Sequence, residues 1–122
     1  PAVELFAASS APWNNHDDPD GTHVTDGPFL YRTSGGKLLM LWSTFGKHGY
    51  AIGYYVSQSG GIEGPWVPAE QPLFDRDGGH GMLFTDKSGQ LMLTIHSPND
   101  TPNERAVFLP VIDTGDGLTP RA

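Results

Sequence analysis

The strongest constraint on the fold of this sequence is a pattern that occurs twice. Residues 26–43, DGPFLYRTSGGKLLMLWS, resemble residues 80–97, HGMLFTDKSGQLMLTIHS, with a glycine at the second position and another in the turn of each copy. Each copy is an apolar run, a short turn and a second apolar run, which is the pattern of a β-hairpin. Because the runs are nearly continuous, we expect strands that are buried on both faces.

The pattern extends beyond each hairpin. A third strand-like run follows each copy at nearly the same distance, at residues 50–56 and 105–112, and a fourth segment at residues 66–74 separates the two units. Three or four antiparallel strands repeated at about 50 residues are typical of β-propeller blades. Reading the copies from their first residues aligns Asp26 with His80, so that a one-residue slip falls in the turn, where such slips are tolerated.

The length of the chain limits how much of a propeller it can form. With 122 residues it is too short for a closed ring, since propellers typically have four to eight blades of about 40 to 50 residues. We therefore predict an all-β fold that is a partial β-propeller. Residues 1–6 would form an outer strand of a preceding blade, residues 26–74 a complete blade, and residues 80–113 most of the next blade. The missing N-terminal blades of the same protein are then the expected partner.

The composition excludes several classes of partner and site. The net charge is −7, with 14 acidic and 7 basic residues, whereas nucleic acids and anionic membranes are bound by basic patches. No stretch approaches the roughly 18 apolar residues of a membrane span. The absence of cysteine excludes disulfides, zinc–thiolate sites and a cysteine nucleophile. We expect neither a nucleic-acid nor a membrane partner.

Two polar residues begin the inner strands of the two predicted blades, near the propeller axis. Asp26 precedes Gly27 at a narrow, partly desolvated position, where a raised pKa would suit a general acid; alternatively it is a turn aspartate that bonds its own backbone. His80 lies between two glycines, so its imidazole has room to bind a metal or to orient a catalytic group. The alternative for His80 is a histidine satisfied by backbone groups.

Further candidates surround these strands. Residues 7–25 form a long irregular insertion, and loops of this length are either functional or mobile. Its acidic stretch at residues 17–21, DDPDG, lacks the spacing of a calcium-binding EF-hand and is expected to be a solvated loop. Trp13 and Phe45 are candidate sugar-stacking residues. His96, at the end of a hairpin strand, is expected to be buried and structural.

Four motifs in this order resemble a known family. They are TDGPFLY from residue 25, GKLLMLWS from residue 36, IEGPW from residue 62 and GGHGM from residue 78. The series is similar to the C-terminal part of glycoside hydrolase family 43, over about residues 3–111. That family consists of five-bladed propellers and includes arabinanases, α-L-arabinofuranosidases and β-xylosidases. The resemblance implies that this chain forms about two of five four-stranded antiparallel blades.

The resemblance also assigns roles to the two axial residues. Asp26 takes the position of the family's general acid, which is usually a glutamate followed by Gly-Pro or Ala-Pro. His80 matches a glycine-flanked histidine that contacts, in many members, a calcium or other ion whose remaining ligands are mainly water. The base and the pKa-modulating aspartate of the family belong to the first two blades, and nothing in this chain matches their motifs.

The implied function is a glycosidase, an inverting hydrolase of α-L-arabinofuranosyl or β-xylosyl linkages in plant polysaccharides such as arabinan and xylan. Its substrate would be an oligosaccharide or polysaccharide, its only possible cofactor calcium, and its location secreted or periplasmic in a bacterium. The isolated chain should be inactive, since it holds a single candidate carboxylate at the axis. Two alternatives remain: a catalytically degenerate propeller that binds glycans through Asp26 and His80, or a protein-interaction platform that uses residues 7–25.

Overall fold

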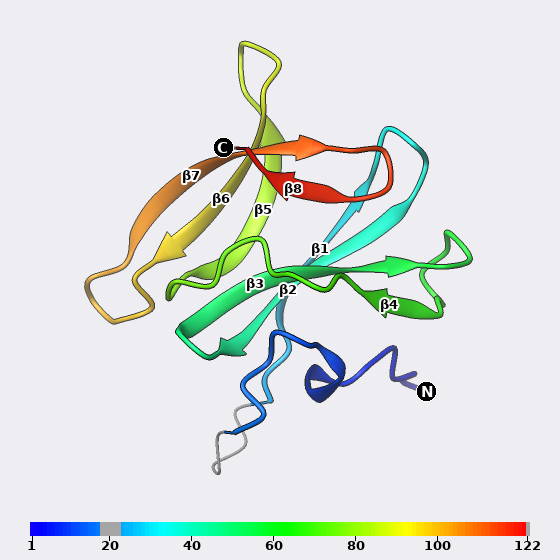
Figure 1. The fold of residues 1–122 in the computed structure, drawn as a ribbon, viewed down its shortest axis with the longest axis horizontal. Helices are drawn as coiled ribbons and strands as arrows, with labels where there is room; N and C mark the ends of the chain where they lie inside the picture. The colour runs from blue at the N-terminus through cyan, green and yellow to red at the C-terminus, as the bar shows by residue number, and fades with distance from the viewer. Residues whose placement is uncertain (18–22, 122) are drawn as a thin grey trace.

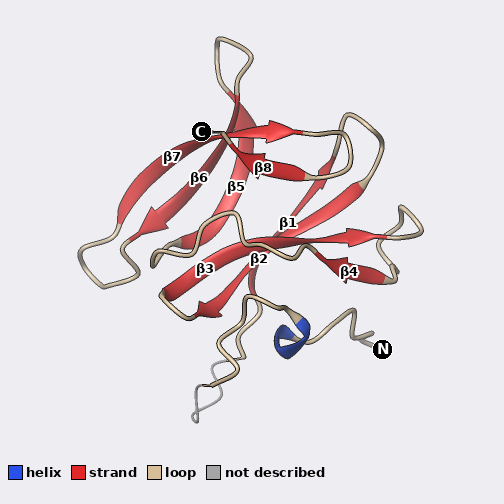
Figure 2. Ribbon diagram, in the orientation of Figure 1, coloured by secondary structure: helices blue, strands red, loops and turns tan. Residues whose placement is uncertain are grey.

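A computed structural model of the chain describes residues 1–17 and 23–121. The chain forms two four-stranded antiparallel sheets, in each of which the strands follow one another in sequence order (Figures 1 and 2). The first sheet contains β1 (Asp26–Arg32), β2 (Leu38–Gly46), β3 (Gly49–Ser57) and β4 (Trp66–Pro68). The second contains β5 (Gly79–Thr85), β6 (Leu91–Ser97), β7 (Arg105–Asp113) and β8 (Leu118–Pro120). The all-β prediction is confirmed, and each sheet has the strand order of a propeller blade.

The strand registers correct the alignment of the two copies. Asp26 pairs with Ser43 in the first sheet, and Gly79 pairs with His96 in the second, each followed by a register irregularity. The structural equivalent of Asp26 is therefore Gly79, and His80 corresponds to Gly27. Both Gly27 and His80 have the same left-handed φ of 54°. The sequence alignment was off by one residue because it matched Gly27 with Gly81. In the structure, the equivalent positions are those with the same backbone conformation at the bulge, Gly27 and His80.

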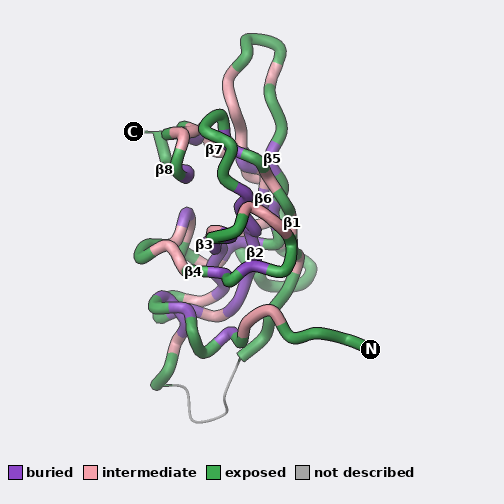
Figure 3. Tube along the Cα trace, turned by 90° about the vertical axis from the view of Figure 1, so that its right-hand side faces the viewer, coloured by how far each residue is buried: buried purple, intermediate pink, exposed green. Residues whose placement is uncertain are grey.

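The hydrophobic core lies between the two sheets and on one outer face of the first sheet. Between the sheets, apolar side chains of β2 and β3 pack against those of the second sheet; the fully buried members include Leu39, Leu41, Ile52, Leu93 and Val111. The other face of the first sheet, which carries Trp42 and Tyr55, is covered by the segment that precedes β1. Strand β2 is thus buried on both faces as predicted, and Figure 3 shows the buried positions concentrated there.

Strand β6 does not meet the same expectation. Only Leu93 and Ile95 of this strand are buried, and its other residues are intermediate, so its two faces are covered unequally. Exposed apolar side chains lie on β5 and β7 of this sheet, among them Met82, Phe84 and Phe108.

The two ends of the chain show how far its own sheets extend. Residues 1–6 form no strand: Phe6 instead stacks on Tyr55, with ring centroids 4.2 Å apart, so this segment covers the face of the first sheet and does not extend an edge. The second blade is complete, because β8 pairs with β7 beyond residue 113. After β4, a single bridge joins Phe74 to Ile52, so the fourth strand is shorter than residues 66–74. In the described part of the chain, no helix is long and apolar enough to cross a membrane.

Candidate functional site

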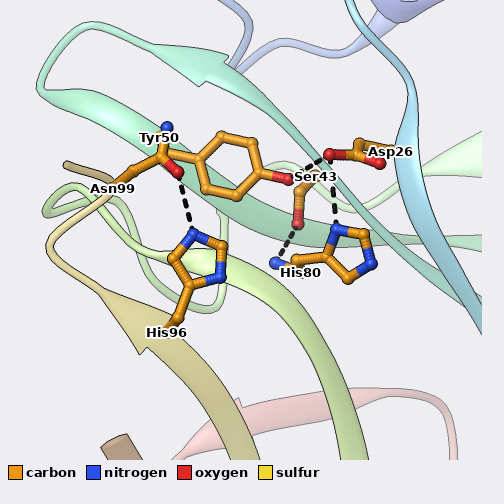
Figure 4. Close-up of polar contacts among 6 residues, drawn as sticks. All are labelled: Asp26, Ser43, Tyr50, His80, His96 and Asn99. Carbon is orange, nitrogen blue, oxygen red and sulfur yellow. Dashed lines mark hydrogen bonds and ion pairs between the residues drawn. The ribbon is translucent and has the colours of Figure 1, made fainter. Parts of the chain in front are cut away.

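The starts of β1 and β5 lie side by side where the two sheets meet, and they bring the two predicted axial residues into contact (Figure 4). His80 Nδ1 lies 3.3 Å from Asp26 Oδ2. The side chains of His80 and Asp26 are 54% and 49% exposed. The repeat predicted that these residues face each other; in the structure they touch directly.

Local backbone geometry explains this contact. A Cβ atom on Gly27 would lie 2.8 Å from His80 Cδ2, so only a glycine lets the imidazole lie across β1. The backbone N–H of His80 donates a hydrogen bond to Ser43 Oγ at 2.8 Å. This bond fixes the residue in its left-handed conformation, which costs a non-glycine residue on the order of 1–2 kcal/mol. Such local strain is commonly found at functional sites.

Tyr50, at the start of β3, completes the site and was not identified from the sequence. Its side chain is buried, and its hydroxyl donates a hydrogen bond to Asp26 Oδ2 at 2.7 Å. His96 stacks on its ring, with centroids 5.5 Å apart and an interplanar angle of 24°. The only sequence feature that pointed to Tyr50 was the hairpin between Gly46 and Gly49. This hairpin places Tyr50 opposite Phe45 and next to the end of β2.

The electrostatics of Asp26 differ from the expectation. The hydrogen bond from Tyr50 lowers the pKa of Asp26 most; burial opposes this effect, and the hydrogen bond and charge of His80 reinforce it. The net pKa lies below the ordinary aspartate value, so the predicted raised pKa is wrong. The reason is that the carboxylate is half-exposed and faces donors, whereas desolvation dominates only in apolar surroundings. Burial, followed by the neighbouring Asp26, raises the pKa of Tyr50, which therefore keeps its proton.

The structure treats the four remaining candidates differently. Trp13 is not available for sugar stacking: it is 8% exposed and packs against Trp42, with ring centroids 4.9 Å apart. Phe45 lies beside Tyr50, with centroids 5.3 Å apart, and its role in sugar binding stays a prediction. His96 is half-buried, not buried, and its Nε2 donates to Asn99 Oδ1 at 2.8 Å. Most of the acidic stretch at residues 17–21 lies outside the described residues.

The side chains around His80 do not by themselves provide enough ligands for a calcium ion. Calcium takes six to eight oxygen ligands, and this cluster offers one carboxylate, whose Oδ2 already accepts a hydrogen bond from Tyr50. Among the residues that the structure describes, no group of three acidic, histidine or cysteine side chains is arranged to hold a metal ion. A calcium ion that His80 contacts through water remains a prediction, and the proposed role of Asp26 does not depend on such an ion.

Asp26 also lines a small groove, to which His80 does not contribute. Its volume is about 180 Å³, and it runs between β1 and the segment that precedes it. The groove is mostly apolar and is lined by Leu5, Phe6, Thr25, Asp26, Pro28, Met40 and Trp42. A mostly apolar groove with a few polar groups is a common form of ligand site.

Comparison with solved structures shows which proteins this chain resembles. No family model and no curated protein matches the chain. Among solved structures, an endo-arabinase from Bacteroides thetaiotaomicron VPI-5482 is 47% identical over 92% of this chain, with a TM-score of 0.78. A thermostable family-43 glycoside hydrolase shares the fold, with a TM-score of 0.65 at 21% identity. The chain is therefore similar to part of an endo-arabinase and has the fold of a family-43 glycoside hydrolase.

An arabinofuranosidase also shares the fold of this chain. An α-L-arabinofuranosidase from Lactobacillus brevis aligns over 80% of it with a TM-score of 0.62 at 23% identity. The chain spans 41% of the length of the endo-arabinase and 36% of the length of the arabinofuranosidase. It therefore corresponds to less than half of each of these proteins.

Proposed function

We propose that this chain acts within a larger propeller as one side of an inverting glycoside hydrolase site that cleaves α-L-arabinofuranosyl or β-xylosyl linkages in plant polysaccharides. The observation that carries the proposal is the half-exposed carboxylate of Asp26, beside an apolar groove, in a chain 47% identical to an endo-arabinase. The groove would hold a sugar ring next to the carboxyl group.

Inversion requires two carboxyl groups about 6.5 to 9.5 Å apart, one to protonate the leaving oxygen and one to activate water. Asp26 is proposed as the acid, and the base would come from another blade of the same protein. Tyr50 and His80 favour the ionised form of Asp26, so a nearby carboxylate must raise its pKa before it can donate a proton. Such a like-charged neighbour across the pocket would have this effect.

The lowered pKa of Asp26 favours a second candidate function, a propeller that binds glycans without cleaving them. An ionised Asp26 would then accept hydrogen bonds from sugar hydroxyl groups, while the groove contacts the apolar face of the ring. The third possibility, a protein-interaction platform at residues 7–25, has less support. Ala8, Ala11 and Trp13 of that segment are buried against the first sheet.

The test is to incubate the full-length protein with linear arabinan and with xylan and to follow the anomeric protons by NMR. We expect release of oligosaccharides whose new reducing ends first appear as the inverted anomer. Products that first appear with retained configuration would contradict the inverting mechanism. Binding of arabinan without any release of reducing ends would contradict hydrolysis and support the glycan-binding alternative.

A further inference from the structure

Hydrogen bonds fix the backbone of Tyr50 on both sides. Its backbone N–H donates to Asp77 Oδ1 at 3.2 Å, and its carbonyl accepts from the N–H of Gly78 at 2.8 Å. Asp77 has a left-handed φ of 63°, an uncommon conformation for a residue other than glycine. The connection between the two sheets thus fixes both backbone polar groups of Tyr50.

The ring of Tyr50 is fixed as well. It is 3% exposed and lies in contact with Phe45 and His96. Gly79 passes so close that a Cβ atom there would lie 2.9 Å from the ring carbon Cε2. His96 is in turn held by Asn99. With its backbone and ring both constrained, the hydroxyl of Tyr50 has one place to point, toward Asp26 (Figure 4).

The two neighbours of Asp26 meet the same carboxylate oxygen. The hydroxyl of Tyr50 lies 2.7 Å from Oδ2, and Nδ1 of His80 lies 3.3 Å from that atom. Oδ1 has no side-chain partner among the described residues. Rotation about the bond between Cβ and the carboxyl carbon would otherwise move the free oxygen, because this torsion is broad in aspartate.

We propose that Tyr50 is a positioning residue: it anchors Asp26 by Oδ2 so that Oδ1 is the oxygen presented to the sugar. The proposal rests on the function proposed above. Tyr50 itself does not need to touch the substrate.

The test compares two Tyr→Phe variants of the full-length protein. In Tyr50→Phe we expect kcat on arabinan to fall about tenfold to a hundredfold with little change in KM, because a displacement of about 1 Å at a reacting group can cost a hundredfold. Tyr31→Phe is the matched control: its hydroxyl also donates to a carboxylate, Asp113 Oδ2 at 2.8 Å, but near the other end of β1. It should leave kcat unchanged.

A second measurement does not depend on hydrolysis. High-resolution crystal structures report the carboxylate torsion of Asp26, and we expect one orientation in the wild type and in Tyr31→Phe but more than one in Tyr50→Phe. A Tyr50→Phe variant that keeps the single orientation would overturn the proposal, whatever its kcat. If the wild type cleaves neither polymer, the proposed function fails, and the crystal structures still decide whether Tyr50 positions Asp26.

Discussion

At the scale of single residues, Asp26 shows that hydrogen bonds outweigh desolvation at this site. The sequence places it at a strand start near an axis, where burial would favour the protonated acid. In the structure its carboxylate is half-exposed and accepts a hydrogen bond from Tyr50. The donors lower the pKa of Asp26 more than partial burial raises it. Any proton-donating role therefore needs further negative charge nearby.

Gly79 provides a test of the packing around this site. A Cβ atom at this position would lie 2.8 Å from Ser43 Oγ and 2.9 Å from the ring of Tyr50. Gly79→Ala should therefore destabilise the full-length protein by about 1–3 kcal/mol, as overpacking usually does. Urea denaturation measures this change. An unchanged midpoint would mean that the ring of Tyr50 moves aside at little cost, and that the site is less rigid than described.

The contact between Asp26 and His80 could be predicted from the repeat, because equivalent strand starts converge in a propeller. The role of Tyr50 could not be predicted, because it depends on how the Gly46–Gly49 hairpin orients the ring of Tyr50 toward Asp26. Trp13 was misread for a related reason. Its ring fills a gap over Gly53, where a Cβ atom would lie 2.5 Å from the indole. Local sequence gives no sign of this contact.

At the scale of elements, the two sheets are joined by their turns at the end opposite to Asp26. Asp113, at the end of β7, accepts hydrogen bonds from the Tyr31 hydroxyl at 2.8 Å and the Ser34 N–H at 2.7 Å. The N–H of Gly115 donates to its other oxygen at 2.8 Å. One carboxylate therefore links the β1–β2 turn to the β7–β8 turn.

Asp113→Asn should weaken this link, and the effect should depend on pH. Burial raises the pKa of Asp113, but the hydrogen bonds from Gly115, Ser34 and Tyr31 outweigh it, so the pKa lies below the ordinary value. The stabilisation is then present above about pH 4 and is lost as the pH falls through the folded-state pKa. At neutral pH we expect the variant to lose about 1–3 kcal/mol.

Thermal unfolding at neutral pH and at about pH 2.5 checks this prediction. Asp116→Asn, in the same turn but exposed, is the control and should unfold like the wild type. The difference between the wild type and Asp113→Asn should shrink in acid. If that difference is the same at both pH values, the ionised carboxylate of Asp113 does not hold the turns together.

The strands themselves were largely predictable, because β2 and β6 lie in apolar runs bounded by turn residues. Strand β8 was missed, since Leu118–Pro120 contains a single aliphatic residue and forms only by pairing with the end of β7. The packing of the first six residues could not be predicted, because the apolar character of Leu5 and Phe6 does not distinguish a strand from a segment that packs across the face of a sheet.

At the scale of the whole molecule, the two sheets differ in how they are covered. The first sheet is packed on both faces. On the second sheet, Met82, Phe84 and Phe108 are 48%, 37% and 55% exposed, and the rings of Phe84 and Phe108 pack edge to face at 6.0 Å. Exposed apolar side chains that cluster on one face mark contact surfaces. In a propeller, a neighbouring blade would cover this face.

The isolated chain should therefore self-associate in solution. Sedimentation velocity over a range of concentrations would show this, and Phe84→Ser combined with Phe108→Ser should shift the distribution toward the monomer. Val3→Ser is the control, because Val3 is 79% exposed and lies outside the second sheet. A wild-type chain that stays monomeric at all concentrations would argue that the second sheet needs no neighbour.

The most direct test of the account is the rate of arabinan hydrolysis by the full-length protein with Asp26→Asn. The substitution keeps the size of the side chain but removes the acid, and general acid catalysis contributes about a hundredfold to ten-thousandfold to the rate. We predict a loss of at least a hundredfold in kcat, with unchanged thermal stability and with Asp116→Asn as active as the wild type. An Asp26→Asn protein that hydrolyses arabinan at a rate close to that of the wild type would contradict the central claim that Asp26 is the catalytic carboxyl group of this chain.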